Sequence, residues 1–218
     1  MKKKIEDIIK RLDVLSIVIL KDLSMNQSIC RNEIDQYYAT LKELKELTKN
    51  DKFISRAITA EIYYLHSQLL VQSNYARNNQ EQLIAEFYRF KKHIDDLLFH
   101  DVPDYDNTIT KISEEFAILS KAIEKAIKQC VIPKDDLESL HKILRQVVKM
   151  YEGQNSIPKI LGCRVFEMCM MLLSNSDYVK KPQVGALFRN SLSETTDPLL
   201  IEFWQLEELM GTFFGINY

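Results

Sequence analysis

The distribution of glycine and proline is the feature that most constrains the fold of this 218-residue chain. All five glycines lie at or after Gly153, and all five prolines lie at or after Pro103. Because these two residues most often interrupt regular secondary structure, residues 1–102 are expected to form long, uninterrupted helices. Neither GxGxxG nor GxxxxGK occurs anywhere in the chain, so a nucleotide fold built on glycine-rich phosphate loops is excluded from our hypotheses.

Apolar residues recur at steps of three and four along the chain, which is the spacing of a helix with one buried face. The first helix is expected over residues 3–23. Further apolar series run from Ile34 to Leu44, Ile54 to Leu69, Leu83 to Leu97 and Ile109 to Cys130. The polar stretches SMNQS, TKND and ARNNQEQ separate these helices, and Asp51 is predicted to cap the third.

The C-terminal third differs, because its expected helices are shorter and each begins near a proline. These prolines are Pro133, Pro158, Pro182 and Pro198. Gly153 is predicted to end the helix that begins at Pro133. No β-hairpin signal and no repeat of fixed period is evident.

The predicted fold is therefore all-α, a bundle of about nine helices. Long antiparallel helices are expected over residues 1–130 and a compact group of shorter helices over residues 131–218. The boundary lies near CVIP at residues 130–133, as a linker or as a bend inside one domain.

The charge balance is close to neutral, with 29 basic and 31 acidic residues. A nucleic-acid-binding protein usually has a basic excess, so a helical nucleic-acid-binding regulator is only our second alternative. No apolar run approaches the ~20 residues that a membrane-spanning helix needs. The N-terminal MKKKIEDIIK lacks the apolar core of a signal peptide, and the four cysteines show no CxxC spacing. We expect a cytoplasmic protein with reduced thiols.

The run FEMCMMLLS at residues 166–174 concentrates sulfur-containing side chains. Cys163, Glu167 and Met170 share one face of the expected helix, so a Cu(I) site is one interpretation. Methionine and free cysteine are also common core residues, and the helix is apolar almost all round. We therefore expect a buried core helix.

Acidic residues and imidazoles are densest in HIDDLLFHDVPDYD, residues 93–106. His93, Asp96 and His100 line one flank of a helix, and such side chains can bind a transition metal. The same flank continues through Glu86 and Arg89, opposite the apolar series, so a solvent-exposed polar face is the simpler interpretation.

The segment LLFHDVPD also resembles the metal-binding helix end of HD-domain phosphohydrolases, which are all-α. The resemblance implies a metal held by His100 and Asp101, with His66 from LHSQLL and Asp177 from NSDYV. In that family the metal generates the hydroxide that attacks phosphorus. The chain departs from the family pattern just after Asp101, where Val102 and Pro103 replace an isoleucine-glycine turn.

Other catalytic patterns are absent or incomplete. GxSxG and HExxH do not occur. A HEPN-type ribonuclease would have four to six residues between an arginine and a histidine on one helix, whereas only three residues lie between Arg89 and His93. The doublets Tyr37-Tyr38 and Tyr63-Tyr64 are each predicted to place one ring in the core and one at its edge.

The end of the chain combines a basic stretch with an apolar helix. Residues 178–190 contain Lys180, Lys181 and Arg189 and no acid, and residues 191–218 contain five acids and no base. The helix expected over residues 198–215 includes Trp204, Phe213 and Phe214, and its broad apolar face must be covered. Its own domain or a second chain could cover it.

We therefore predict a non-enzymatic α-helical interaction or assembly subunit that binds another protein chain or itself. The expected interaction residues are Lys180, Lys181, Arg189, Trp204, Phe213 and Phe214. No cofactor, membrane or small-molecule substrate is expected. The first alternative is a metal-dependent phosphohydrolase of the HD type.

Overall fold

The computed structural model describes residues 2–76, 78–98, 105–129, 133–175, 205–206, 208–210 and 212–214. Seven helices, further helical residues between 205 and 214, and two three-residue strands make up the secondary structure of these ranges. The prediction of an all-α helical bundle is confirmed. None of the described helices is both long and apolar enough to span a membrane.

The chain divides into two compact units, Met1–Pro103 and Asp104–Tyr218. This division differs from the predicted boundary near residue 130, because the helix over residues 107–128 packs with the helices that follow it. The break falls where Pro103 ends the part of the chain that lacks both glycine and proline.

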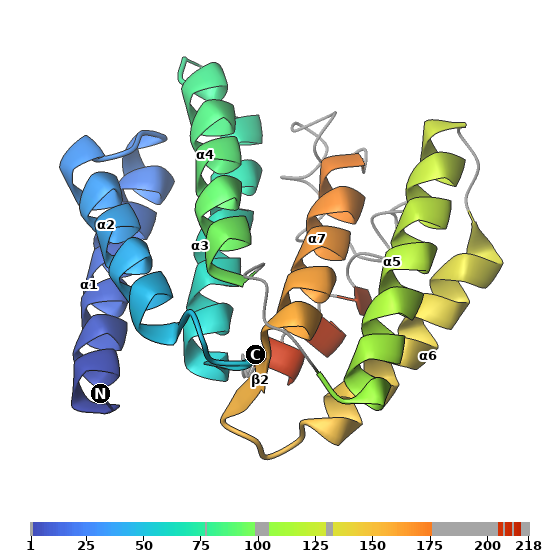
Figure 1. Cartoon of the computed structure of the whole chain (residues 1–218). Helices are drawn as coiled ribbons and strands as arrows, with labels where there is room; N and C mark the ends of the chain where they lie inside the picture. The colour runs from blue at the N-terminus through green and yellow to red at the C-terminus, as the bar shows by residue number, and fades with distance from the viewer. Residues whose placement is uncertain are drawn as a thin grey trace. The chain divides into compact units, whose positions relative to one another are not determined.

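The first unit is a four-helix bundle. Its elements are α1 (Lys2–Asn26), α2 (Arg31–Thr48), β1 (Phe53–Ser55), α3 (Arg56–Tyr75) and α4 (Gln80–Leu98). Helix α1 packs against α2 and α3, and α4 packs against α3 and α2, so the four helices enclose one core. Figure 1 shows α1 and α3 running in one direction and α2 and α4 in the other.

The predicted apolar series form this core. Fully buried members include Ile8, Leu12, Ile34, Leu44, Ile58, Leu65, Leu83, Phe90 and Ile94. The prediction that Asp51 caps the third helix is wrong. Strand β1 intervenes, and α3 begins after Ser55, whose side chain makes no capping hydrogen bond.

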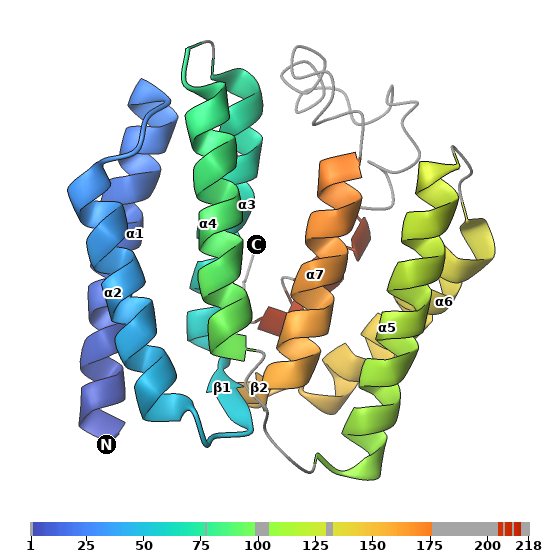
Figure 2. The same ribbon diagram turned by 45° about the horizontal axis from the view of Figure 1, so that its top comes forward.

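The second unit contains α5 (Asn107–Lys128), α6 (Lys134–Met150), β2 (Ser156–Pro158), α7 (Lys159–Asn175) and the C-terminal helical residues. Helix α5 packs against α6 and α7, as Figure 2 shows. The Asp106 carboxylate caps α5 by accepting hydrogen bonds from the N–H groups of Thr108 and Ile109 at 2.9 and 3.0 Å. Gly153 follows the end of α6 with φ of 72°, a left-handed conformation that favours glycine.

The two units repeat one order of elements, in which two helices are followed by a short strand and then by further helix. Helices α2 and α3 begin at Arg31 and Arg56, and α6 and α7 begin at Lys134 and Lys159, each 103 positions later. The packing repeats as well, since α5 contacts α6 and α7 as α1 contacts α2 and α3.

The repeat preserves few residue identities, which explains why no fixed period is evident in the sequence. Across the same offset of 103 positions, buried Tyr63 corresponds to buried Phe166, and buried His66 corresponds to buried Cys169. The buried positions recur, and a few hold the same residue, such as Leu41 and Leu144, Ile54 and Ile157, and Leu69 and Leu172, whereas others are filled by different residues.

Candidate functional site

Helix α1 carries two apolar faces instead of one. The first faces the bundle core and consists of Ile8, Leu12, Ile19 and Leu23, all 0–1% exposed. The second consists of Val14, Ile17, Val18 and Met25, which are 42–71% exposed. At 100° per residue, these four side chains fall within roughly 100° of arc on the side opposite the core. We call them the outer stripe of α1.

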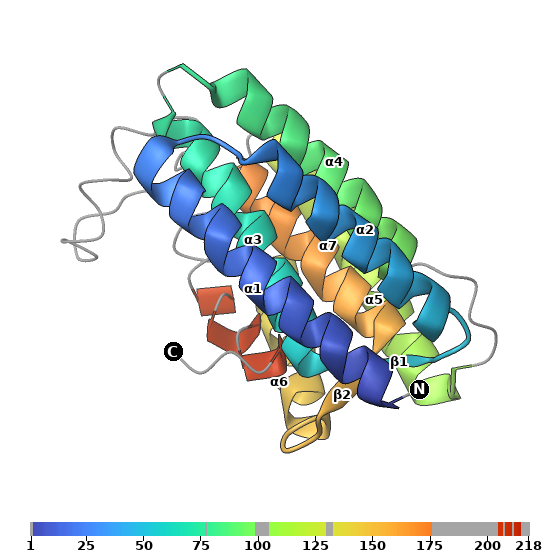
Figure 3. The same ribbon diagram turned by 90° about the vertical axis from the view of Figure 1, so that its left-hand side faces the viewer.

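A groove runs beside the outer stripe, between α1 and α2. Its volume is about 560 Å³. Lys10, Arg11, Val14 and Leu15 line it from α1, and Gln36, Ala39, Thr40 and Glu43 line it from α2. The two helices lie side by side in Figure 3, as their packing requires.

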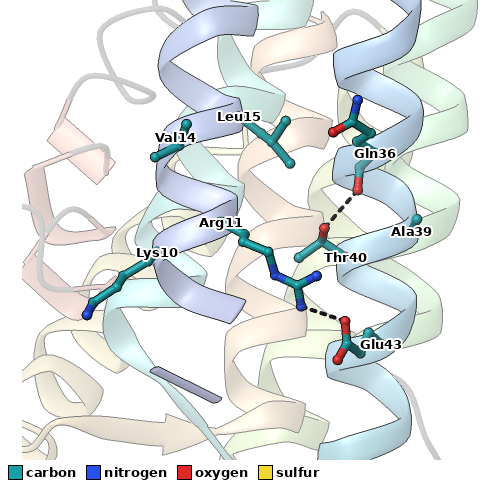
Figure 4. A pocket seen from close by; sticks show the side chains of 8 residues that line it. All are labelled: Lys10, Arg11, Val14, Leu15, Gln36, Ala39, Thr40 and Glu43. Atoms are coloured by element: carbon teal, nitrogen blue, oxygen red, sulfur yellow. Dashed lines mark hydrogen bonds and ion pairs between the residues drawn. The ribbon is translucent and has the colours of Figure 1, made fainter. Parts of the chain in front are cut away.

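The side chains of the groove divide into two rows (Figure 4). Arg11 and Leu15 point toward α2, whereas Lys10 and Val14 point away from it. The Arg11 guanidinium donates a hydrogen bond to the Glu43 carboxylate at 2.5 Å and so joins the two helices at one end of the groove. This ion pair holds the pKa of Glu43 below its ordinary value.

Two lysines share the face of the outer stripe, one before Val14 and one between Val18 and Met25. Lys10 and Lys21 lie on the same face as the stripe residues, about 16 Å apart along the helix axis. Both are exposed, and neither forms an ion pair with any described residue. The outer stripe therefore shares its face with two lysines that form no ion pair among the described residues, and Asp7 precedes Lys10 by one turn while Asp22 adjoins Lys21.

The buried polar groups of the first unit lie in its core and between α2 and α4. His66 is 0% exposed, and its Nε2–H donates to the Phe87 carbonyl oxygen at 3.0 Å. Its ring stacks on the Phe87 ring with centroids 4.1 Å apart. Burial lowers the pKa of His66 to about 3, so the imidazole is neutral at pH 7.

The remaining ligands implied by the phosphohydrolase resemblance, His100, Asp101 and Asp177, lie outside the described residues. Within the described ranges, no group of three or more histidine, cysteine, aspartate or glutamate side chains could hold a metal. His66, the implied ligand that is described, is a core histidine bonded to the backbone.

Glu86 centres a charged network between α2 and α4. Its carboxylate is 3% exposed and accepts a hydrogen bond from the Tyr38 hydroxyl at 2.6 Å. Arg31 forms an ion pair with it, and the Arg89 Nη1 lies 3.5 Å away. The sequence interpretation of this flank as fully exposed is therefore wrong at Glu86, and Tyr38 is buried together with Tyr37. Tyr63 and Tyr64 divide as predicted, at 1% and 50% exposed.

Helix α7 is the buried core helix that was predicted from its methionines. Cys163, Met168, Cys169 and Met170 are all 0–4% exposed. Glu167, which shares a face with Cys163 and Met170, instead accepts an ion-pair hydrogen bond from Arg164 at 3.0 Å. The carboxylate is thus paired with a cation on its own helix.

The predicted C-terminal interaction residues separate into two groups. Phe213 and Phe214 are each 1% exposed, and Phe213 meets the Tyr151 ring edge-on with centroids 6.4 Å apart. Phe213 therefore packs on a ring of its own unit, and the assignment of both residues to an interface stays a prediction. Lys180, Lys181, Arg189 and Trp204 lie outside the described residues.

The outer stripe of α1 was missed by the sequence analysis, which followed only the longer inner series of that helix. The signal was present, because Val14, Ile17 and Val18 also recur at steps of three and four. An apolar residue at such spacing does not by itself say whether it faces the core. Comparison with known protein families, characterised proteins and solved structures gives no match for this chain.

Proposed function

We propose that this chain is a non-enzymatic, cytoplasmic helical interaction or assembly subunit, and that α1 and α2 bind an amphipathic helix of another protein. The outer stripe of α1 is the observation that carries this proposal. Val14, Ile17, Val18 and Met25 supply four of the large exposed apolar side chains on the described surface, aligned on one helix face. Aligned anchors of this kind are what a helix-in-groove contact uses.

The size of the apolar surface sets the expected strength of the contact. Complete burial of the four stripe side chains would contribute on the order of 5 kcal/mol before the cost of association. That is too little for a stable complex by itself. The adjoining groove of about 560 Å³ offers the additional surface, with Leu15 and Ala39 as its apolar contacts.

The position of Lys21 favours a different chain over a second copy. In a parallel pair of α1 helices Lys21 would meet its own copy, and like charges repel. In an antiparallel pair centred on the stripe, Lys21 would lie against Val14 or Val18. A partner helix with acidic residues opposite Lys10 and Lys21, and apolar residues between them, matches both the charges and the stripe.

The proposal is tested by photo-crosslinking in the native host. A benzoylphenylalanine at Val14 is expected to crosslink to a heterologous peptide whose apolar residues recur at steps of three and four. The double substitution Val14→Asp and Ile17→Asp is expected to reduce recovery of that partner at least tenfold, because it places two carboxylates in the apolar contact.

Ile118 provides the matched control, since it is 67% exposed on α5. The buried residues Leu12 and Ile19 of α1 align with the buried residues Phe116 and Ile123 of α5 at an offset of 104 positions, which pairs Ile118 with Val14. Ile118→Asp should leave recovery of the partner unchanged. Crosslinks that join two copies of this chain, with a dimer in light scattering that Val14→Asp abolishes, would instead assign the surface to self-association. Absence of any crosslink that depends on the stripe would refute the proposal.

A further inference from the structure

A second hollow lies between α2 and α4 of the first unit, separate from the groove between α1 and α2. Its volume is about 340 Å³. Leu41, Lys42, Lys45 and Glu46 line it from α2, and Arg89, Lys92, His93 and Asp96 line it from α4. Four permanent cations thus face one small space together with two carboxylates.

One wall of this hollow is held rigidly. Arg89 donates to Asp35 at 2.9 Å, lies 3.5 Å from Glu86, and stacks 4.7 Å from the centre of the Tyr38 ring. Tyr38 is itself fixed by its hydrogen bond to the buried Glu86. Arg89 is therefore ordered, and its charge is shared with two carboxylates.

The three lysines differ from Arg89, because no described carboxylate lies within ion-pair distance of them. Lys42, Lys45 and Lys92 form no ion pair with any described residue, whereas Glu46 is paired with Lys49 at 3.6 Å. Like charges that line one small space repel one another, and an anion within that space relieves the repulsion. The lining is thus suited to an anion that carries more than one negative charge.

His93 adds a neutral donor to the same lining. Its ring stacks on Tyr38 with centroids 4.2 Å apart and planes inclined by 17°. Partial burial and the neighbouring Arg89 lower the pKa of His93, so its ring is uncharged at pH 7 and can donate one N–H to a ligand oxygen.

We propose that the hollow between α2 and α4 binds a compact phosphate-bearing anion through Lys42, Lys45 and Lys92, with His93 as an additional hydrogen-bond donor. The volume lies at the lower end of the range for small-molecule pockets. Glu46 and Asp96 in the same lining, and Asp35 paired with Arg89, limit the cationic surface. A polynucleotide backbone needs a longer cationic track, so a small soluble anion fits better.

The proposal is tested by calorimetric titration of the full chain with inorganic pyrophosphate and with inorganic phosphate at constant ionic strength. Pyrophosphate is expected to bind saturably and more tightly than phosphate, because it can reach more of the three lysines. The triple substitution K42Q/K45Q/K92Q should weaken binding at least tenfold. Asp96→Asn should strengthen binding several-fold, since it removes a carboxylate that repels the anion.

The matched control is K121Q/K125Q/K142Q, which makes the same charge change on exposed lysines of α5 and α6. It should leave the affinity within twofold of the unmodified chain. Because Asp96→Asn is expected to increase affinity, a damaged fold cannot imitate its result. Lack of saturable pyrophosphate binding would overturn the proposal, as would equal losses in both triple variants. Tighter binding of a single-stranded oligonucleotide than of pyrophosphate, lost in K42Q/K45Q/K92Q, would overturn it in favour of nucleic acid.

Discussion

The two units of the molecule share one arrangement of helices but fill it with different side chains. In the first unit the third helix of the arrangement buries His66, and α4 buries Glu86. In the second unit the position equivalent to His66 holds Cys169, and α7 is rich in buried methionine. The second unit buries other polar groups, Lys159 at 0% and Ser113 at 3% exposed, so a common pattern of burial accommodates different polar residues at different positions.

The exposed side chains of the two units differ as well. Helix α1 exposes Val14, Ile17 and Val18 along one face. On the corresponding face of α5, Ile118 is followed by Lys121 and Lys125. The comparison indicates that the arrangement of helices is maintained by the core, whereas binding properties reside in positions that the core leaves unconstrained. Both proposed binding surfaces lie in the first unit.

The largest expected effect tests whether the stability of each unit depends on its own core. Phe90 is 0% exposed and meets the rings of Tyr37 and His66, both with centroids 5.4 Å away. Phe90→Ala should lower the free energy of unfolding by about 3–5 kcal/mol, since it removes buried surface and leaves a cavity. Hydrogen exchange should show the loss of protection in α2, α3 and α4. Equal loss of protection in α5 and α6 would show that the two units are not stabilised by separate cores.

The next effect concerns the polar interior of the first unit. Glu86→Ala should lower the free energy of unfolding by about 2–3 kcal/mol, measured by urea denaturation at pH 7, because the buried Tyr38 hydroxyl loses its acceptor. Tyr38→Phe removes the donor instead and should cost less. The double variant should be less destabilised than the sum of the single ones. Additive losses would mean that the two groups do not act as a pair.

A third effect is the dependence of stability on pH. Glu61 accepts a hydrogen bond from Ser16 at 2.6 Å, and burial raises its pKa from 4.5 to about 7. The folded chain therefore binds this proton more tightly than the unfolded chain. The resulting stabilisation is complete below pH 4.5 and is lost as the pH rises through about 7. We expect Glu61→Gln to remove a decrease of roughly 1–2 kcal/mol between pH 5 and 8, allowing for solvent screening.

His66 makes the opposite contribution and must be separated from that of Glu61. Its pKa falls from 6.5 to about 3 on folding, so the unfolded chain takes up a proton that the folded chain does not. Stability therefore decreases as the pH drops below about 6.5. In Glu61→Gln only this acid-side decrease should remain in urea denaturation curves. An unchanged alkaline decrease in that variant would show that another group is responsible.

The smallest effect distinguishes how the second helix of each unit ends. Gly153 adopts φ of 72° after α6, and a Cβ there would meet nothing within 4 Å. Gly153→Ala should cost about 1 kcal/mol in thermal or urea denaturation through backbone strain alone. Lys49, which follows α2, has an ordinary φ of −56°, so Lys49→Ala should change stability by less than about 0.5 kcal/mol. Similar losses of stability in both variants would show that the ends of α2 and α6 do not differ in backbone strain.

Much of the architecture could be predicted from local signals. The spacing of Leu83, Phe87, Phe90, Ile94 and Leu97 describes the buried face of α4 correctly, because helical periodicity is a local property. The break at SMNQS and the end of α6 before Gly153 are local in the same sense. The strand β1 was not predictable in this way, since a three-residue strand has no periodicity to recognise.

The candidate sites were harder to predict from the sequence than the helices were. Glu86 resembles any polar residue on an exposed flank, and its burial depends on Tyr38 and Arg31, about 50 residues away in the chain. His66 could be a metal ligand or a core residue by its sequence context. Its hydrogen bond to the Phe87 carbonyl oxygen and its stacking on the Phe87 ring show that it is a core residue.

By itself the sequence determined that this chain forms helices, where most of them begin and end, and that its methionine-rich segment is buried. These properties follow from side-chain periodicity and from the placement of glycine and proline, which act within a few residues. The tertiary structure alone decided that the helices form two units with one repeated arrangement. It also decided that one apolar series of α1 faces the core and the other faces solvent. That choice depends on which helices pack against α1, and packing joins residues that are distant in the chain.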